Sequence, residues 1–337
     1  MNIYLKNVSK KIKNFKLVCS NNLNLLKEIG HAQIYKILFF TIISSFLEIF
    51  SAGLFISFIF KNYSIFRIIN YQLYSYLNNI ELLIIFLFLI IIRGYLLTLI
   101  NFSKENLKIK YNDKLRRNFL ELIISSSHTD VAELSRSKLI GSLITNISIC
   151  TLSIDQSLRL IQYGISLVIY VIFLLGVKSE NLYFLLIAII ATLIASLFQK
   201  TDNLSIGRIQ NQINSSIQKT VGDGLYYFKT LKAYRIETNI LKDFEKDIKF
   251  KRKLINKITI QNSVFSSLRE SFVIISLISW ILLRQENFNR AELITIIAIA
   301  YKISNLTASI INAFRMATLS NSGYEELVYL RNKLLSL

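Results

Sequence analysis

The stretch of sequence that decides the fold is TVGDGLYYFKTLKAYRIETNILKDFEKDIKF, residues 220–250. It is too polar and too basic to lie in a bilayer, although the segments before and after it are strongly apolar. Apolar residues recur in steps of three and four along 213–231 and again along 240–248, which predicts two helices that each have one apolar face. The pattern is interrupted at 234–239. We therefore expect a short element between two long helices, in a position typical of a contact surface for a partner.

The composition predicts a membrane protein. The chain has 337 residues, of which 53% are hydrophobic, and its mean hydropathy of +0.45 lies outside the range of soluble globular domains. The formal net charge is +19, but the basic residues fall between the apolar runs and form no patch with interleaved aromatic residues. Membrane topology explains this charge better than nucleic acid does, so we expect no nucleic-acid partner.

Six segments reach or approach the ~20 apolar residues that cross a hydrocarbon core of ~30 Å. They are residues 34–60, 81–102, 158–177, 182–199, 264–283 and 292–314. The connections after the second and fourth segments are long and basic, so the positive-inside rule places both termini and both long connections in the cytoplasm. We expect a multi-pass protein of a bacterial inner (plasma) membrane.

Both long connections are predicted to continue the helices beyond the membrane. Along 107–122 the apolar residues step by four and three, which extends the second span as one helix over 81–125. The sequence SSSHTD at 125–130 interrupts this pattern, and the next helix is expected to return from about residue 137. The predicted fold class is an all-α membrane protein with six long transmembrane helices and two cytoplasmic hairpins, each ending in a short helix. Residues 1–30 predict a separate amphipathic helix on the cytoplasmic membrane surface.

Three groups of residues occupy fixed places in this topology. They are Glu48 and Gly53 in the first span, Leu115, Arg116 and Gly141 in the first long connection, and Lys232, Ala233, Tyr234, Glu237 and Phe244 in the second. In their order and spacing these groups resemble the transmembrane domain of ABC exporters, the type with six spans per subunit and domain-swapped dimers. The resemblance extends over about 34–334, and Ser57 departs from it at a position where the family often has proline.

The resemblance implies two coupling helices, 129–136 and 234–239, which in the family dock onto nucleotide-binding domains. The residues assigned to this contact are Thr129, Asp130, Val131, Glu133, Arg136, Tyr234, Arg235, Ile236, Glu237 and Asn239. It also implies a transmembrane domain over 31–320, followed at 321–337 by the end of the last helix, where a nucleotide-binding domain normally begins.

The sequence contains no phosphate-binding loop of the form G-x-x-x-x-G-K-[ST]. We therefore expect no cofactor in this chain, and ATP and Mg²⁺ bound by a separate ATPase partner. A second transmembrane subunit is also expected, in a homodimer or a heterodimer. The chain is then a natural half of a transporter, a fragment or an orphan.

Three ionisable residues, Glu48, Arg93 and Lys302, stand near the middle of predicted spans, where charge is costly and commonly functional. One hypothesis is that they line the translocation pathway with a net positive field, which favours an anionic substrate such as a lipid phosphate or a lipid-linked glycan. The alternative is that Glu48 and Arg93 form an ion pair that fixes helix packing while Lys302 snorkels.

A polar stripe follows Lys302 in steps of three and four and consists of Asn305, Ser309 and Asn312. The family resemblance implies that this span helps to line the translocation pathway. The alternative is that these side chains hydrogen-bond across helices.

No catalytic or metal-binding constellation is visible in the sequence. Cys19 and Cys150 are far apart, and His31 and His128 have no carboxylate or cysteine at ligand spacing. We expect a chain that is not an enzyme by itself. The predicted function is that of the permease subunit of an ABC exporter, with lipid, lipid-linked glycan or another amphipathic anion as substrate. The alternative is a degenerate exporter-fold scaffold or regulatory subunit without transport activity.

Overall fold

A computed structural model describes most of the chain, and every element in the described part is a helix. The described residues are 20–22, 24–25, 31–59, 79–127, 134, 136–177, 189–190, 192–194, 203–235, 237–284 and 290–335. The elements, in chain order, are α2 (His31–Ile59), α4 (Asn79–Ser125), α6 (Arg136–Gly141), the π-helix η1 (Ser142–Asn146), α7 (Ile147–Val177), α9 (Asn203–Tyr226), α10 (Phe228–Tyr234), α11 (Glu237–Arg284) and α12 (Arg290–Leu335).

Three of the helices are unusually long. α4 has 47 residues, α11 has 48 and α12 has 46. The sequence has no proline that would remove a backbone donor and kink them. At ~1.5 Å per residue each helix is about 70 Å long, more than twice the thickness of the hydrocarbon core. α4 agrees closely with the helix predicted over 81–125.

Within the described residues, four helices are long and apolar enough to cross a membrane: Ala32–Phe55, Leu83–Ser125, Lys138–Phe173 and Ile297–Leu335. They contain most of the predicted first, second, third and sixth spans, so the chain has the character of a helical, multi-pass membrane protein. The predicted fifth span, 264–283, lies in α11, which is not among the four. The predicted fourth, 182–199, lies mostly outside the described residues. The total of six spans therefore stays a prediction.

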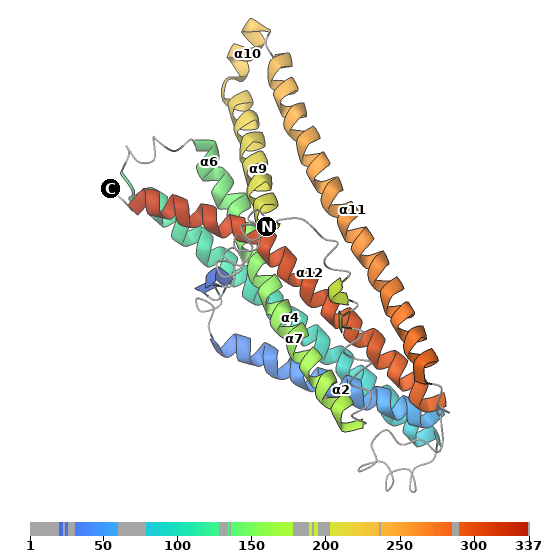
Figure 1. Cartoon of the computed structure of the whole chain (residues 1–337). Coiled ribbons are helices and arrows are strands. Elements are labelled where there is room, and N and C mark those ends of the chain that lie inside the picture. Colours follow the sequence, from blue (N-terminus) through green and yellow to red (C-terminus); the bar gives the residue numbers. More distant parts are fainter. Residues whose placement is uncertain are drawn as a thin grey trace, which may run out of the picture.

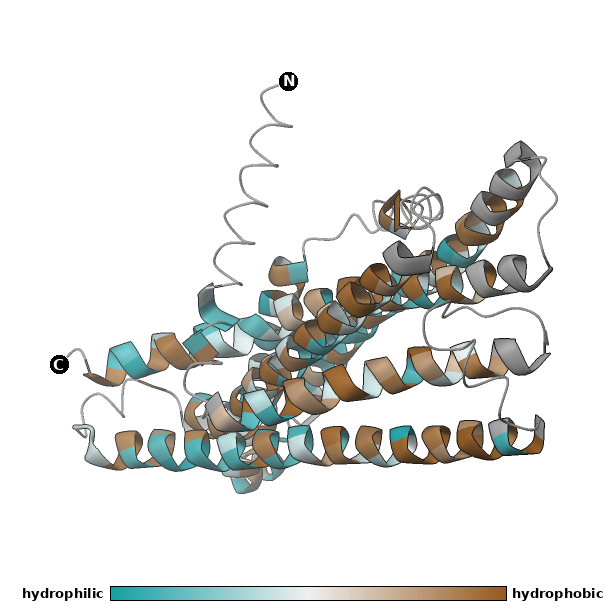
Figure 2. Ribbon diagram, turned by 90° about the horizontal axis from the view of Figure 1, so that it is seen from below, coloured by the Kyte–Doolittle hydropathy of each residue, from teal (hydrophilic) through white to brown (hydrophobic). Residues whose placement is uncertain are grey.

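A bundle of α2, α4, α7 and α12 holds the core (Figure 1). One cluster of buried residues, including Ile37, Ile100 and Ile154, joins α2, α4 and α7 and continues to the C-terminal part of α12. A second cluster, with Ile49 and Ile303, lies at the other end of the bundle. Apolar residues gather toward the end opposite the C-terminus, whereas hydrophilic residues are more frequent near it (Figure 2).

α9, α10 and α11 form an arm that projects beyond the bundle (Figure 1). The base of α9 packs closely on α12, because a Cβ on Gly207 would lie only 2.3 Å from the Leu319 carbonyl oxygen. Arg208 of α9 also makes two hydrogen bonds to the Glu325 carboxylate of α12, at 2.8 and 3.0 Å. α11 is attached to α12 through a small cluster that includes Phe265.

The chain reverses direction at the tip of the arm. α10 ends at Tyr234, and Arg235 follows with φ 54°, the only positive φ of a non-glycine residue in the described part of the chain. The interruption predicted at 234–239 is therefore present at Arg235. The separate short helix, however, is Phe228–Tyr234, and Glu237 and Asn239 belong to the first turn of α11 because that helix begins at Glu237.

The returning helix of the first hairpin begins at Arg136, close to the predicted residue 137, and contains the π-helix η1. A Cβ on Gly141 would lie 1.9 Å from Oε1 of Gln218, so the glycine allows this α9 side chain to cross the returning helix. Gln218 Nε2 donates a hydrogen bond of 2.7 Å to Thr145 Oγ1 of η1. This contact joins the arm to the first hairpin.

Part of the N-terminal segment contacts the bundle. Leu25 is buried in the larger core cluster, and Asn22 Oδ1 accepts a hydrogen bond of 2.9 Å from Ser153 of α7. Asn21 donates one of 3.3 Å to Asn321 of α12. Most of the predicted surface helix 1–30 lies outside the described residues.

Candidate functional site: a charged cluster and an exposed tip

Three of the sequence-predicted residues meet at one carboxylate inside the bundle. α2 carries Glu48, α4 carries Arg93 and α12 carries Lys302. An Arg93 guanidinium nitrogen lies 2.8 Å from Glu48 Oε1, and Lys302 Nζ lies 2.5 Å from the same oxygen. With two cations and one carboxylate, the formal charge of this cluster is 2 − 1 = +1.

The ring of Tyr170 and apolar residues of the second buried cluster border the charged cluster. Tyr170 of α7 is buried beside Ile49 and Ile303, and Lys302 Nζ lies 5.9 Å from the centre of its ring. The side chains of Glu48 and Lys302 keep one fifth to one third of their surface exposed in the isolated chain. The cluster is therefore only partly shielded by this single chain.

The structure contains the ion pair between Glu48 and Arg93 that the packing hypothesis predicts. Lys302 contacts the same oxygen of Glu48. Arg93 Nε is buried and has no hydrogen-bond partner among the described residues. Chemically, the arrangement can hold α2, α4 and α12 together, and its excess positive charge can attract an anion.

The predicted polar stripe does not join this cluster through hydrogen bonds to described residues. Asn305 and Ser309 are half-buried and Asn312 is exposed. The neighbouring Ser304 is buried instead, and its hydroxyl lies 3.3 Å from that of Thr192. The orientation of α12 about its axis therefore places Ser304 toward the interior instead of the predicted polar stripe.

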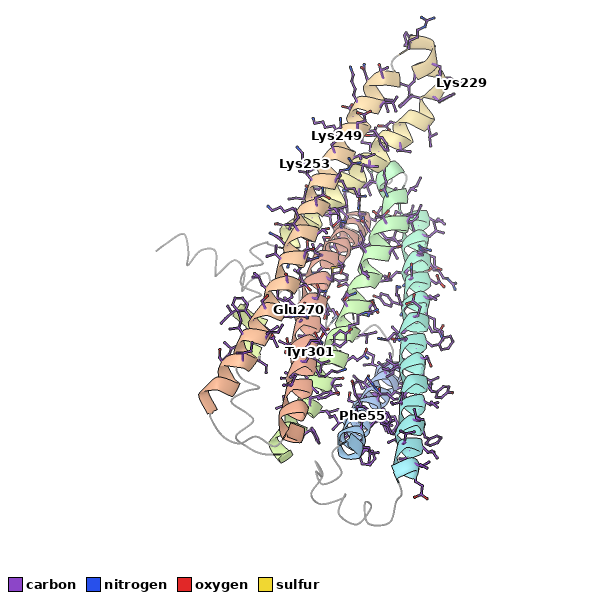
Figure 3. The ribbon with its side chains drawn as sticks, turned by 90° about the vertical axis from the view of Figure 1, so that its right-hand side faces the viewer. Phe55, Lys229, Lys249, Lys253, Glu270 and Tyr301 are labelled. Carbon is purple, nitrogen blue, oxygen red and sulfur yellow. The ribbon has the colours of Figure 1, made fainter. Side chains whose placement is uncertain are left out.

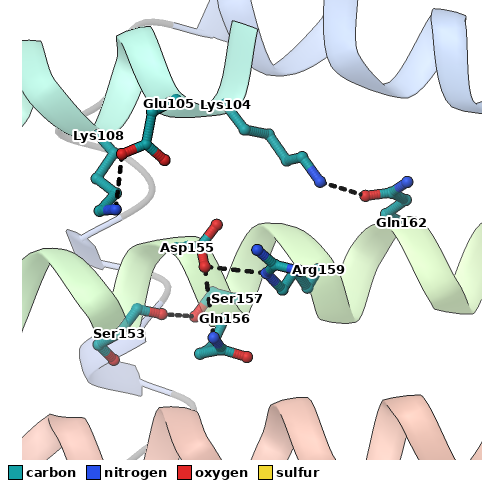
Figure 4. Close-up of polar contacts among 9 residues, drawn as sticks. All are labelled: Lys104, Glu105, Lys108, Ser153, Asp155, Gln156, Ser157, Arg159 and Gln162. Carbon is teal, nitrogen blue, oxygen red and sulfur yellow. Dashed lines mark hydrogen bonds and ion pairs between the residues drawn. The ribbon is translucent and has the colours of Figure 1, made fainter. Parts of the chain in front are cut away.

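Sequence reasoning missed a second polar cluster between α4 and α7 (Figure 4). Lys104 is only 6% exposed, and its Nζ donates a hydrogen bond of 2.8 Å to Gln162 Oε1. On α7, Arg159 Nε lies 2.9 Å from Asp155 Oδ2. Two signals were available: Lys104 stands two residues after the apolar run 81–102, and Asp155 and Arg159 are four residues apart in a helix with no other charged residue.

Arg315 of α12 was also missed. It is 4% exposed, and its Nε has no hydrogen-bond partner in the described part of the chain. The signal in the sequence is a single cation between apolar neighbours, just beyond the predicted sixth span. A buried cation with an unpartnered donor lowers the stability of the fold, so its place must be favoured by other contacts of α12.

The tip of the arm exposes aromatic side chains. Tyr226 and Tyr234 are 74% and 73% exposed, and Tyr227 and Phe228 are also exposed. Lys229 lies at the same tip, while Lys249 and Lys253 follow along α11 (Figure 3). The predicted coupling residues Arg235 and Asn239 are exposed as well.

For the other predicted coupling residues the structure gives little or no description. Thr129, Asp130, Val131, Glu133 and Ile236 lie outside the described residues, and Arg136 and Glu237 are known only as the first residues of α6 and α11. In the part of the chain that the structure describes, no group of three or more His, Cys, Asp or Glu residues is arranged to hold a metal ion.

Comparison with known proteins adds no assignment. No protein-family model matches the chain, and no curated protein matches it.

Proposed function

We propose that this chain is the transmembrane subunit of an ABC exporter-type transporter, driven by an ATPase partner that binds ATP and Mg²⁺. The observation that carries the proposal is the projecting arm with its aromatic tip. The resemblance of the sequence to the family, through residues such as Tyr234 and Phe244, supports the same assignment.

The tip has the chemistry of a protein contact. Tyr226, Tyr227, Phe228 and Tyr234 expose large aromatic surfaces at the end of a helical pair, where no other described element covers them. Aromatic residues are enriched where protein interfaces gain most of their binding energy, and exposed apolar groups on a projecting element favour a protein partner.

The charge of the arm favours a cytoplasmic tip. Lys229, Lys249 and Lys253 lie along it (Figure 3), and lysine-rich segments next to spans stay on the cytoplasmic side. In this orientation both hairpins would face an ATPase in the cytoplasm. ATP-driven closure of that partner would then move the arm and rock the spans between two states.

The charged cluster of Glu48, Arg93 and Lys302 supports an anionic substrate. Its formal charge is +1, and Arg93 Nε has no hydrogen-bond partner among the described residues. A lipid phosphate or lipid-linked glycan combines an anionic head with an apolar tail, which matches a charged group between apolar helices.

A second transmembrane subunit is part of the proposal. Ile260, Val264 and Ile274 of α11 are exposed in the isolated chain, and α11 touches α12 only through a small apolar cluster of described residues. Exposed apolar residues in the second half of α11 are available to pack against a second subunit or against lipid.

One observation favours the alternative of a scaffold or regulatory subunit without transport. Glu48 is contacted by both cations, and such a closed cluster also serves to fix helix packing. Charge reversal at Arg93 and Lys302 separates the two functions. A transporter should change which substrates stimulate ATP hydrolysis, whereas a scaffold should lose stability alone.

The test of the proposal uses the tip. The full chain is purified from its native membrane, and an ATP-binding chain should accompany it. Tyr226→Ala with Tyr234→Ala should abolish this association. Tyr35→Ala, which removes a tyrosine of similar exposure on α2, should leave it intact. Retention of the ATPase by the tip variant, or its absence from the wild-type preparation, would overturn the proposal.

A further inference from the structure

A cavity of about 390 Å³ lies outside the charged cluster and the arm, between α4, the start of α7 and the C-terminal part of α12. Its volume falls in the range of ~300–1,000 Å³ that small-molecule sites occupy. The floor is apolar and includes the buried residues Phe119, Ile147 and Leu327. The cavity is therefore shaped to take an apolar group rather than a bare ion.

Two cations stand on the wall of this cavity. Lys114 comes from α4 and Arg331 from α12, and the amide of Asn118 lies on the same side of the chain as Lys114, one turn further along α4. Both cations are exposed. Neither forms an ion pair with another residue in the described part of the chain, and no carboxylate is among the described residues that line the cavity. Its formal charge is therefore +2.

An apolar floor with two unneutralised cations is complementary to an anion that carries one hydrocarbon chain. Electroneutral ligands would leave both cations without a counter-charge, and a simple anion would leave the apolar floor empty. The two cations therefore favour an anionic head group, and the apolar floor favours a hydrocarbon chain.

The position along α4 favours a ligand that is not an ordinary bilayer lipid. Lys114 lies about 18 Å along the helix beyond residue 102, where the predicted hydrocarbon-crossing part ends. Lys104, Lys108 and Lys110 occupy the intervening turns. A phospholipid with two chains anchored in the bilayer would have to leave it to reach the floor of the cavity.

We propose that this cavity, here called the Lys114–Arg331 pocket, binds an anionic single-chain amphiphile, with a carboxylate or phosphate head on the two cations and an acyl chain on the apolar floor. The site is separate from the contact surfaces used in the proposed function, and it stands or falls independently of them. Binding there would connect α4 with the C-terminal part of α12.

The test is photolabelling of the full chain in nanodiscs of phosphatidylcholine. The probe is dodecanoate that carries a diazirine in its chain, and the labelled peptides are identified by mass spectrometry. Labels are expected on the segments of α4 and α12 that line the pocket. Unlabelled dodecanoate and dodecyl phosphate should both compete, whereas dodecyltrimethylammonium, with the same chain and a positive head, should not.

Two variants locate the site. Lys114→Glu with Arg331→Glu should reduce pocket labelling about tenfold, because two attractive charges become repulsive. Arg252→Glu with Lys253→Glu makes the same change of charge at two exposed residues of α11, which contributes no residue to the pocket, and should label like the wild type. Val328→Trp keeps both cations but narrows the pocket, and should also lose the label.

Unchanged labelling in the Lys114→Glu, Arg331→Glu protein would overturn the proposal, as would equal competition by the cationic amphiphile. Pocket labelling by diazirine phosphatidylglycerol as strong as that by the fatty acid would also overturn it, because the occupant would then be a two-chain bilayer lipid.

Discussion

Arg93 and Lys302 meet at the same oxygen atom of Glu48, although one cation belongs to α4 and the other to α12. A single carboxylate therefore separates two positive charges within an apolar part of the bundle. Its removal leaves like charges close together, which is more costly than the loss of one isolated ion pair.

Glu48→Gln should lower the free energy of unfolding by about 1–3 kcal/mol, less than the ~3–5 kcal/mol of a fully buried pair because the three side chains are partly exposed. The measurement is denaturant unfolding in detergent. Adding Lys302→Met to Glu48→Gln should restore part of the loss, since one of the two repelling cations is removed. Equal stability of wild type and Glu48→Gln would contradict this account.

The hydrogen bond between Lys104 and Gln162 should matter more than its exposed counterpart one turn away. Gln162→Leu leaves a buried ammonium without that bond and should cost about 1–3 kcal/mol of unfolding free energy. Lys108→Met removes the ion pair with Glu105, whose side chain is 57% exposed. This change should alter the free energy of unfolding by less than ~0.5 kcal/mol. If both changes have the same small effect, the Lys104 contact does not stabilise the bundle.

Gly207 should not tolerate a methyl group. In Gly207→Ala the new Cβ meets the Leu319 backbone oxygen at 2.3 Å, so α9 must move away from α12 at a cost of about 1–3 kcal/mol. Gly164→Ala is the control, because among the described residues no atom beyond the adjacent residues and the nearby helix backbone lies within 4 Å of its added Cβ. That change should stabilise the protein by up to ~1 kcal/mol through helix propensity. Thermal unfolding of both variants checks the difference in sign.

The ion pair between Arg208 and Glu325 should hold the base of the arm. Both groups are partly exposed, so Arg208→Ala should cost less than ~1 kcal/mol in global stability. Amide hydrogen exchange should nevertheless become faster in the first turns of α9, because the two bonds to α12 are lost. The charge swap Arg208→Glu with Glu325→Arg should restore slow exchange. Unaltered exchange in Arg208→Ala would show that packing around Gly207 suffices.

The sequence predicted the long helices of the hairpins better than the short helix at the tip of the arm, and the short helix predicted at 129–136 lies mostly outside the described residues. The apolar spacing along 107–122 and the SSSHTD segment placed the end of α4 at Ser125. At the arm, the interruption of the spacing located the break at Arg235, but it did not locate the short helix, which is Phe228–Tyr234. A helix of seven residues contains too few turns to produce a recognisable apolar period.

The sequence identified the residues of the charged cluster but not the contacts between them. Glu48, Arg93 and Lys302 attract attention because each is charged within an apolar run. Lys104 escaped notice because it stands at the edge of such a run, where a lysine normally reaches water. Its burial depends on Gln162, 58 residues away in the chain.

By itself the sequence determined helix length, apolar content and the place of the main break, because these depend on local backbone chemistry and on the ~3.6-residue repeat of one helix. Only the tertiary structure decided which charges meet and which face of α12 turns inward. These features depend on the rotation and axial register of each helix against its neighbours. This rotation and register bring together Glu48 and Lys302, which are 254 positions apart in the chain. Neither segment alone contains a signal for the contact.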